Sequence, residues 1–369
     1  MEIDYARHYL DTGSSRICIE KTSSAIETEP CLKIKNPLRD KKYSFEKLTT
    51  VICPQNKSKV MHISITGDLG SGKSTVAKEI CRVLSFKYLS TGQIQRQLGQ
   101  ERGMNTLEFN KFTDSNKEID DYIDQRLKDI NNQTDPYVLD SRLGWHFVNT
   151  SFKIYLMAVD EVAASRVLVD EKRIGEPLAL DIKAKIKEQH ERRKIENDRF
   201  EKNYGIKPSI FKDFDAIVDT SSASIAEVTN LILALYAKFE KKEHYNKIWL
   251  SPHRIFPTKN GRSMVSEEAK RIKENIREKG FDVEFPISCV LFQKEFYAFD
   301  GHKRLSACLH SKLPFIPISL TAKNEDTINP TLKVEQFVKG NLNISMINHW
   351  EEVHGFKFYH YPTLLELDK

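Results

Sequence analysis

The sequence predicts an α/β protein, in which a parallel sheet is covered by helices on both faces and a smaller α+β unit follows. Two observations predict this fold. Short apolar runs alternate with helix-like periodicity from about residue 61 to residue 239, which is typical of strands and helices that build a parallel sheet. A glycine-rich segment at residues 67–74 follows the first apolar run and opens a helix, as phosphate-binding loops do.

The expected elements follow from this periodicity in chain order. In the first unit, strands are expected at residues 62–66, 137–140, 152–158 and 216–219. Helices are expected at residues 74–84, from Glu161 onward with Asp160 as cap, at about 178–204 before Gly205, and at about 224–239. In the second unit, helices are expected at residues 266–279 and 303–310, and strands at residues 287–292, 296–299 and 315–320.

The chain of 369 residues is too long for one small core, and its length suggests two or three domains. The charge-rich junction at residues 240–244 marks the boundary between the two folded units. We therefore expect an N-terminal extension at 1–58, a domain around the glycine-rich loop at 59–239, an α+β domain at 247–325 and a C-terminal appendage at 326–369. The appendage carries an aromatic cluster that we expect to be packed: Trp350, Phe356, Phe358, Tyr359 and Tyr361.

Composition excludes several classes of protein. Hydrophobic residues make up 40% of the chain and charged residues 30%, as in an ordinary globular protein. The net charge of +5 is too small to argue for nucleic-acid binding. The six cysteines form no C-x-x-C pair, which fits a reducing compartment. The opening residues lack a secretory signal pattern and no stretch reaches the apolar length of a membrane span, so a cytoplasmic protein without membrane contact is expected. Oligomeric state is not predicted.

The strongest motif is the P-loop pattern G-x-x-x-x-G-K-S at residues 67–74. In this pattern the backbone N–H groups and the start of the following helix surround phosphates, the lysine neutralises the transferring phosphates and the serine binds Mg²⁺. The alternative is a glycine-rich turn without a ligand, which the preceding strand and the following helix disfavour. ATP and Mg²⁺ are therefore the expected cofactors, bound by Gly67, Gly70, Ser71, Gly72, Lys73, Ser74 and Thr75.

Asp140 ends the apolar strand Val138-Leu139-Asp140 and is the expected acidic partner of Ser74 at the metal. A strand-end aspartate can also cap a loop, and that alternative stays open. Arg142 lies two residues further on, where a guanidinium can bind the acceptor's phosphate through two parallel hydrogen bonds.

Several arginines are candidates because phosphoryl transfer is catalysed mainly by positioning and by cations around the migrating phosphate. Arg166 and Arg173 are seven residues apart, as are Arg192 and Arg199, so the arginines of each pair can share a helix face. Any single arginine is usually a solvated surface charge, and Arg193 and Lys194 are interpreted in that way. The catalytic residues predicted are Lys73, Arg142, Arg166 and Arg173, and the further arginines at the substrate are Arg96, Arg192 and Arg199.

With these motifs in order, the span of about 61–236 resembles the cytidylate kinases, especially their short archaeal-type branch. Besides the P-loop, the resemblance is carried by LSTGQIQR at 89–96, QERGM at 100–104, LDSRLG at 139–144, RFEKNYGI at 199–206 and IVDTS at 217–221. It implies an ATP-dependent kinase of a nucleoside monophosphate. Thr91, Gly92 and Arg96 would line the acceptor site, Arg142 would touch the acceptor phosphate, and Arg166 and Arg173 would belong to a closing lid.

The chain departs from that family's pattern at two positions. Gln93 stands where an acidic residue is common, and Ser141 stands where glycine is usual. Because of these departures, the identity of the acceptor's base stays open.

The span of about 249–322 is similar to the ParB/sulfiredoxin-like superfamily through FDGHKRLSA at residues 299–307. The resemblance implies a site for a phosphate or nucleotide at a helix start, formed by Asp300, Gly301, His302 and Arg304. The sequence motif Asp300-Gly301-His302-x-Arg304 is most similar to that of the free-serine kinases. Gly301 occupies the place of the cysteine that a sulfiredoxin needs, and no helix-turn-helix segment follows. The alternative for His302, the cap of a turn, stays open.

The leading hypothesis is an ATP-dependent phosphotransferase acting on a CMP-like or dCMP-like nucleotide, with the ParB-like domain binding nucleotide or substrate. The acceptor can also be a modified nucleotide or one within nucleic acid, which would make nucleic acid a partner of the ParB-like domain. Two alternatives remain. One is a nucleotide-gated module that binds DNA or another partner without net phosphorylation. The other is a small-molecule kinase that uses the C-terminal domain on a serine-like hydroxyl.

Overall fold

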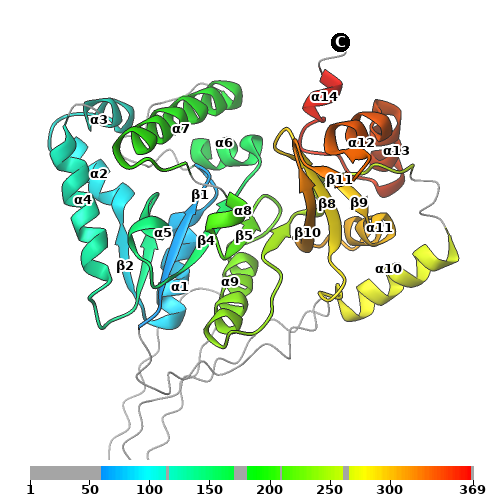
Figure 1. Ribbon diagram of the computed structural model, residues 1–369, viewed down its shortest axis with the longest axis horizontal. Helices are drawn as coiled ribbons and strands as arrows, with labels where there is room; N and C mark the ends of the chain where they lie inside the picture. The colour runs from blue at the N-terminus through cyan, green and yellow to red at the C-terminus, as the bar shows by residue number, and fades with distance from the viewer. Residues whose placement is uncertain (1–59, 114–115, 170–180, 208–209, 261–265, 367–369) are drawn as a thin grey trace, which may run out of the picture. The chain divides into compact units, whose positions relative to one another are not determined.

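The computed structural model describes residues 60–113, 116–169, 181–207, 210–260 and 266–366 (Figure 1). The N-terminal extension, Arg173 and the expected start of the helix at residue 178 lie outside these residues. Below, residues 60–240 are called the P-loop half and residues 245–366 the C-terminal half.

A parallel sheet forms the centre of the P-loop half (Figure 1). Its strands are β1 (His62–Gly67), β2 (Lys87–Ser90), β3 (Tyr137–Asp140), β4 (Ser151–Met157) and β5 (Ala216–Asp219). They lie in the order β2-β3-β1-β4-β5, and each neighbouring pair is parallel. Every residue of β1 is buried, as expected of a central strand covered on both faces. The carboxyl ends of all five strands therefore meet at one edge.

Two helices cover one face of this sheet, α1 (Lys73–Leu84) and α9 (Ile225–Glu240). A capping box, in which Ser224 and Glu227 each bond the other's backbone N–H, begins α9. The opposite face is covered by α5 (Gly144–Phe147) and α7 (Ile182–Tyr204). The remaining helices of this half are α2 (Thr91–Gln100), α3 (Thr106–Thr113), α4 (Lys117–Ile130), α6 (Asp160–Val169) and α8 (Ile210–Asp213).

The C-terminal half extends the same sheet. Its strands are β6 (Ile248–Leu250), β7 (Ile255–Phe256), β8 (Ile287–Phe292), β9 (Glu295–Asp300) and β10 (Ile316–Lys323), in the order β6-β10-β8-β9-β7. β6 pairs in parallel with β5, so ten strands form one sheet across the charge-rich junction. A small hairpin of β11 (Thr327–Asn329) and β12 (Leu332–Lys333) stands apart. The helices of this half are η1 (Pro252–Arg254), α10 (Glu267–Lys279), α11 (His302–His310), α12 (Val334–Asn341), α13 (Ile344–His354) and α14 (Thr363–Glu366).

The expected alternation of strands and helices is confirmed, and the bounds of three strands are those predicted: β3, β5 and β8. The short strands β2, β6, β7, β11 and β12 were missed. Each has only two to four residues, which is too little periodicity to be seen in the sequence alone. No helix in the described ranges is long and apolar enough to cross a membrane.

The aromatic residues of the C-terminal tail pack into the core of this half. Trp350 on α13 is 0% exposed, and its indole Nε1 donates a hydrogen bond of 2.9 Å to the carbonyl of Lys259. Phe358 is buried and lies 5.0 Å, between ring centroids, from Phe256 on β7. The tail therefore belongs to the folded core around β7.

Truncation of Trp350 tests this packing. We expect Trp350→Ala to lower the free energy of unfolding by about 3–5 kcal/mol, the range for a large buried aromatic replaced by alanine. Ile344→Ala on the same helix is the control, because Ile344 is 39% exposed, and it should cost less than about 1 kcal/mol. Urea unfolding followed by circular dichroism measures both variants, and equal losses would contradict the packing described here.

Candidate nucleotide site

The P-loop connects the end of β1 to the start of α1 and requires glycine at two positions. A Cβ on Gly67 would lie 2.1 Å from the carbonyl oxygen of Leu156, and one on Gly70 would lie 2.3 Å from that of Ala163. No side chain of the described residues caps the N-terminus of α1. The first N–H groups of the helix are therefore open to an anion, as in phosphate-binding loops.

Ser74 and Asp140 meet at the edge where the parallel strands end. The Ser74 hydroxyl donates to Asp140 Oδ2 at 2.6 Å, and the hydroxyls of Tyr88 and Ser90 reach the same oxygen at 3.1 and 3.2 Å. A hydroxyl and a carboxylate are suitable oxygen ligands for Mg²⁺, which usually takes few protein ligands and completes its shell with water and phosphate. The described residues contain no group of three or more His, Cys, Asp and Glu side chains that could hold a metal ion.

Lys73 lies inside this loop, where its ammonium donates to the carbonyl of Asp68 at 2.6 Å. Burial, and next the positive charge of Arg142, lower its pKa to about 7, although Asp140 and Asp68 act in the opposite direction. An anionic phosphate beside Lys73 would remove this penalty, because an opposite charge favours the ammonium.

An ion pair with Arg193 on α7 anchors the P-loop. The Asp68 carboxylate accepts hydrogen bonds from the Tyr155 hydroxyl at 2.8 Å, from the backbone N–H of Ala158 at 3.0 Å and from Arg193 at 2.5 Å. Burial alone would raise the pKa of Asp68, but the Arg193 guanidinium and these hydrogen bonds hold it below its ordinary value. The interpretation of Arg193 as a solvated charge is wrong. The sequence did contain a signal for this ion pair: Asp68 lies within the P-loop, and a buried carboxylate needs a cation as partner.

Arg142 connects the P-loop to a buried carboxylate on α7. Its Nη1 donates to the carbonyl of Gly67 at 2.6 Å, and its Nε lies 3.0 Å from Glu196 Oε2. Burial would raise the pKa of Glu196, but Arg142 and then Arg192, whose Nε lies 3.1 Å from Oε1, lower it to about 2. The buried Nη2 of Arg142 has no hydrogen-bond partner in the described part of the chain. That nitrogen is a free donor for an anion.

A pocket that is partly open to solvent lies next to Arg142. Two buried acids of α4, Asp120 and Asp124, were not predicted. Arg199 Nε lies 3.6 Å from Asp120 Oδ2, and Tyr204 hydrogen-bonds Asp124. The lining residues are Thr91, Gln95, Asp120, Ile123, Asp124, Leu127, Ser141, Arg142, Leu143, Glu196, Arg199, Phe200 and Tyr204.

Of the predicted acceptor residues, Thr91, Arg142 and Arg199 line this pocket. Gly92 and Arg96 lie beside each other on α2, where a Cβ on Gly92 would be 3.5 Å from the Arg96 guanidinium. Arg192 contacts the wall of the pocket through Glu196. Their roles at the acceptor stay predictions.

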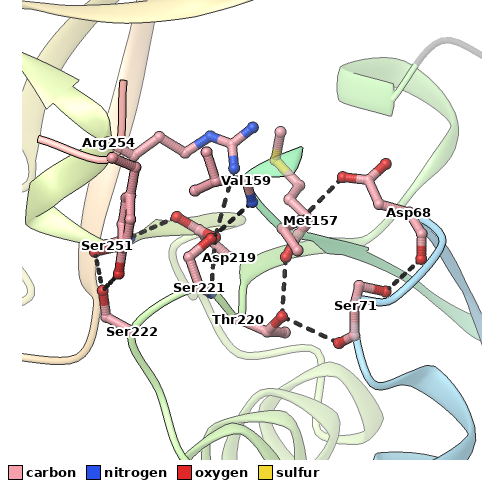
Figure 2. A network of polar contacts seen from close by, with 12 residues as sticks. Asp68, Ser71, Met157, Val159, Asp219, Thr220, Ser221, Ser222, Ser251 and Arg254 are labelled. Atoms are coloured by element: carbon pink, nitrogen blue, oxygen red, sulfur yellow. Dashed lines mark hydrogen bonds and ion pairs between the residues drawn. The ribbon is translucent and has the colours of Figure 1, made fainter. Parts of the chain in front are cut away.

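Arg166 on α6 is held by the loop after β5. Its two terminal nitrogens donate to the hydroxyl of Thr220 at 3.1 Å and to the carbonyl of Thr220 at 2.7 Å. The predicted lid role of Arg166 stays a prediction. Figure 2 shows this loop beside the P-loop residues Asp68 and Ser71.

The four residues predicted as a second phosphate site lie together at the start of α11. Arg304 contacts the carbonyls of Phe285 and Pro286, and its Nη2 lies 3.6 Å from the Asp300 carboxylate. His302 is buried. Its Nε2 accepts from the backbone N–H of Thr258 at 3.1 Å, and no described residue hydrogen-bonds Nδ1.

Burial lowers the pKa of His302 to about 4, so the ring is neutral near pH 7. The cation of this site is therefore Arg304, which already has partners. The site stays a prediction.

The pair of Asp68 and Arg193 predicts a pH-dependent stability. Removal of the cation in Arg193→Met should lower the free energy of unfolding at pH 7 by about 1–3 kcal/mol, since a mostly buried carboxylate loses a partner that is partly open to solvent. The folded-state pKa of Asp68 is depressed, so its stabilisation is present above about pH 4 and is lost as pH falls through the folded-state value.

The difference between Arg193→Met and the wild type should therefore shrink below about pH 4 in urea titrations. Lys194→Met, at an exposed neighbour on α7, is the control and should change little at either pH. A loss that is the same at pH 7 and pH 3 would contradict the assignment.

The chain is similar to several known proteins. The sequence profile of an AAA domain family (AAA_18) matches residues 63–193. Cytidylate kinase from Archaeoglobus fulgidus is 34% identical over 174 residues, which cover 47% of this chain and 93% of that enzyme. Cytidylate kinase from Methanosphaera stadtmanae is 31% identical over 172 residues, which cover 47% and 95%. Among solved structures, shikimate kinase from Acinetobacter baumannii covers 49% of this chain at 15% identity, with a TM-score of 0.35.

A third relative is a longer protein. The S-adenosylmethionine-dependent nucleotide dehydratase from Lacinutrix mariniflava is 32% identical over 177 residues, and the chain spans only 36% of its length. The cytidylate kinases, by contrast, are matched over nearly their whole length. Through its P-loop half, the chain belongs to the family of P-loop kinases that contains the archaeal cytidylate kinases.

Proposed function

We propose that this protein transfers the γ-phosphate of ATP to a nucleoside monophosphate whose base carries an amino group, such as CMP or dCMP. The observation that carries the proposal is the position of Arg142. It contacts the P-loop through the carbonyl of Gly67 and also lines the adjoining pocket. One guanidinium thus lies between the place for a donor phosphate and the place for an acceptor.

On the donor side, the open N–H groups of α1 and the Lys73 ammonium would bind the β- and γ-phosphates. Ser74 and Asp140 would hold Mg²⁺, the Ser74 hydroxyl directly and the carboxylate directly or through water. When bound, this ion would spread the negative charge of the phosphates and of the transition state. The ion pair of Asp68 with Arg193 keeps the loop in place, so its donors need little rearrangement when charge develops.

On the acceptor side, the free Nη2 of Arg142 is the donor for the acceptor's phosphate. Glu196 orients this guanidinium through Nε at 3.0 Å, and the carbonyl of Gly67 holds Nη1. Nη2 is therefore the nitrogen left to donate to a phosphate. A fixed guanidinium positions the attacking phosphate oxygen, and positioning is the main contribution that a protein makes to phosphoryl transfer.

Asp120 and Asp124 would select the base. Both carboxylates are buried in the pocket wall and accept hydrogen bonds, so they suit the exocyclic amino group of cytosine. Uracil and thymine present a carbonyl oxygen at that position, which would face a carboxylate and be rejected. The relatives' names, cytidylate kinase and nucleotide dehydratase, also refer to nucleotides.

The other hypotheses have weaker support. A kinase site in the C-terminal half would need a cation free for phosphate, and Arg304 is engaged by two carbonyls and by Asp300. A module that binds nucleotide without phosphorylation has no need of the acceptor pocket next to Arg142. Phosphoryl transfer in the P-loop half accounts for both features.

An acceptor panel tests the proposal. The purified chain is incubated with ATP and Mg²⁺ plus CMP, dCMP, UMP, AMP, serine or oligonucleotides, and ADP is followed. We expect CMP or dCMP to stimulate ADP formation, and Lys73→Ala to reduce the stimulated rate by about a hundredfold or more. Lys78→Ala, at an exposed position of the same helix, is the control.

Other results of the panel contradict the proposal in different ways. Turnover that survives Lys73→Ala and is lost in His302→Ala would assign the kinase to the C-terminal half. Nucleotide binding without any product above background would favour the nucleotide-gated module.

Base selection has a separate test in Asp124→Asn. An amide can donate to a carbonyl oxygen, so the ratio of kcat/KM for CMP to that for UMP should fall by about tenfold or more, the usual effect of a mismatched buried hydrogen bond. Asp121→Asn, at the exposed position three residues earlier on α4, should leave the ratio unchanged. An unchanged ratio in Asp124→Asn would remove this residue from the base site.

A further inference from the structure

We infer that the C-terminal half holds the ATP side of the kinase site in its working geometry, with Arg254 and Tyr359 as positioning residues. The inference rests on the proposed function in the P-loop half and adds a role for the residues after the junction. The structural element between them is the loop at residues 219–222, which follows β5 and lies next to the P-loop (Figure 2).

Asp219 forms no ion pair with a described residue of its own half, where the charge of Arg166 acts on it only without direct contact. Asp219 ends β5 and is 0% exposed. Within the P-loop half, its Oδ1 accepts from the backbone N–H of Ser221 at 3.0 Å and from the Ser221 hydroxyl at 2.6 Å. Both bonds come from the next turn of chain and neither brings a positive charge. A buried carboxylate is costly unless it is paired with a cation and fully hydrogen-bonded.

The C-terminal half supplies Asp219 with an ion-pair partner and a further hydrogen-bond donor. The backbone N–H of Ser251 donates to Oδ2 at 3.1 Å, and Nη1 of Arg254 lies 3.6 Å from Oδ1 (Figure 2). Both residues follow β6, which pairs in parallel with β5. The carboxyl ends of these strands lie at one edge of the sheet, the same edge from which the P-loop starts, so the contact follows from the extension of the sheet.

The C-terminal tail contacts the same loop. The Ser222 hydroxyl lies 2.7 Å from that of Ser251 and 2.5 Å from the hydroxyl of Tyr359. Tyr359 belongs to the aromatic tail that packs against η1, where the ring centroids of His253 and Tyr359 are 6.0 Å apart. Two separate segments of the C-terminal half therefore hold the loop: the segment after β6 contacts both Asp219 and Ser222, and Tyr359 contacts Ser222.

The loop in turn contacts the P-loop. The Thr220 hydroxyl lies within hydrogen-bond distance of the carbonyls of Ser71, at 3.0 Å, and Met157, at 3.1 Å. Ser71 is a P-loop residue, and its own hydroxyl donates to the carbonyl of Asp68 at 2.8 Å. A shift of the loop after β5 therefore moves an anchor of the phosphate-binding backbone.

The same loop also sets the start of α6. The Ser221 hydroxyl accepts from the backbone N–H of Val159 at 2.9 Å, immediately before that helix. Arg166, on α6, donates to Thr220. Movement of the loop would displace the P-loop and this predicted catalytic arginine together, whereas the acceptor acids on α4 would stay where they are.

The consequence is a specific kinetic pattern. Loss of the contacts to the loop should weaken ATP binding and leave the acceptor's KM nearly unchanged. A general loss of stability would instead lower the amount of active enzyme without changing either constant. Mutations along a coupling network of this kind change affinity by about threefold to thirtyfold.

The test measures ATP affinity directly, in the full-length chain. Isothermal titration calorimetry with ATP and Mg²⁺, without acceptor, gives the Kd of the wild type, Arg254→Met, Arg254→Lys and Tyr359→Phe. We expect Arg254→Met to raise the Kd about threefold to thirtyfold, Tyr359→Phe to raise it less, and Arg254→Lys to recover part of the loss because the cation is retained. The acceptor's KM should stay within about twofold where turnover is measurable.

Matched controls remove the same chemistry elsewhere in the C-terminal half. Lys357→Met breaks the ion pair with the buried Glu351, and Tyr297→Phe removes a hydroxyl that donates to Glu295 at 2.7 Å. Neither side chain touches the loop at 219–222 in the contacts of the described residues. Both controls should keep the wild-type Kd, with unfolding midpoints recorded for every variant.

Two results would overturn the inference: an unchanged ATP Kd in both Arg254→Met and Tyr359→Phe, or an equal rise in the controls. If Arg254→Met does not fold, Tyr359→Phe decides the matter, because it removes a single hydroxyl. A wild type that binds ATP and phosphorylates no acceptor would overturn the proposed function, and the ratio of Kd values would still decide this inference. A wild type that binds no ATP would overturn both.

Discussion

The main constraint on this structure is the burial of carboxylates at the carboxyl edge of a parallel sheet. Asp68, Asp140, Glu196 and Asp219 all lie at or near this edge with little exposure. A buried negative charge is tolerated only with cations and hydrogen-bond donors around it. Each of these carboxylates therefore fixes donors from distant segments, and the fixed donors form the site.

The consequence for chemistry is that the positive groups are held before any substrate arrives. Glu196 binds Arg142 and Arg192, and Asp68 binds Arg193. Such cations need not be gathered at the moment of reaction, which is the source of much of the electrostatic stabilisation in enzymes. Lys73 differs, because its ammonium has a carbonyl for a partner and burial lowers its pKa to about 7. It is the cation of the loop with the most to gain from a phosphate.

The sequence predicted the parts of the site whose signals are local. The P-loop is a single run of residues, and Asp140 is recognised as the polar end of an apolar strand. The pairing of Asp68 with Arg193 spans 125 residues, and adjacent residues on α7 point in directions about 100° apart. The choice between Arg192 and Arg193 thus depended on how that helix is rotated. Asp120 and Asp124 were missed for the same reason, since a charged helix alone does not show which face lines a pocket.

The sheet explains why the two halves need not be independent. β6 has only three residues, too few to be recognised from its sequence, yet its pairing with β5 joins two sets of strands that the sequence assigned to separate domains. A sheet edge left open would expose unpaired backbone groups. β6 provides hydrogen-bond partners for the backbone groups at the edge of β5. Its parallel direction then carries the chain toward the P-loop edge, where Ser251 and Arg254 meet Asp219. β6 thus both covers the edge of β5 and brings Ser251 and Arg254 to Asp219. Ser251 and Arg254 reach the P-loop edge only because the pairing of β6 with β5 fixes the direction of the chain.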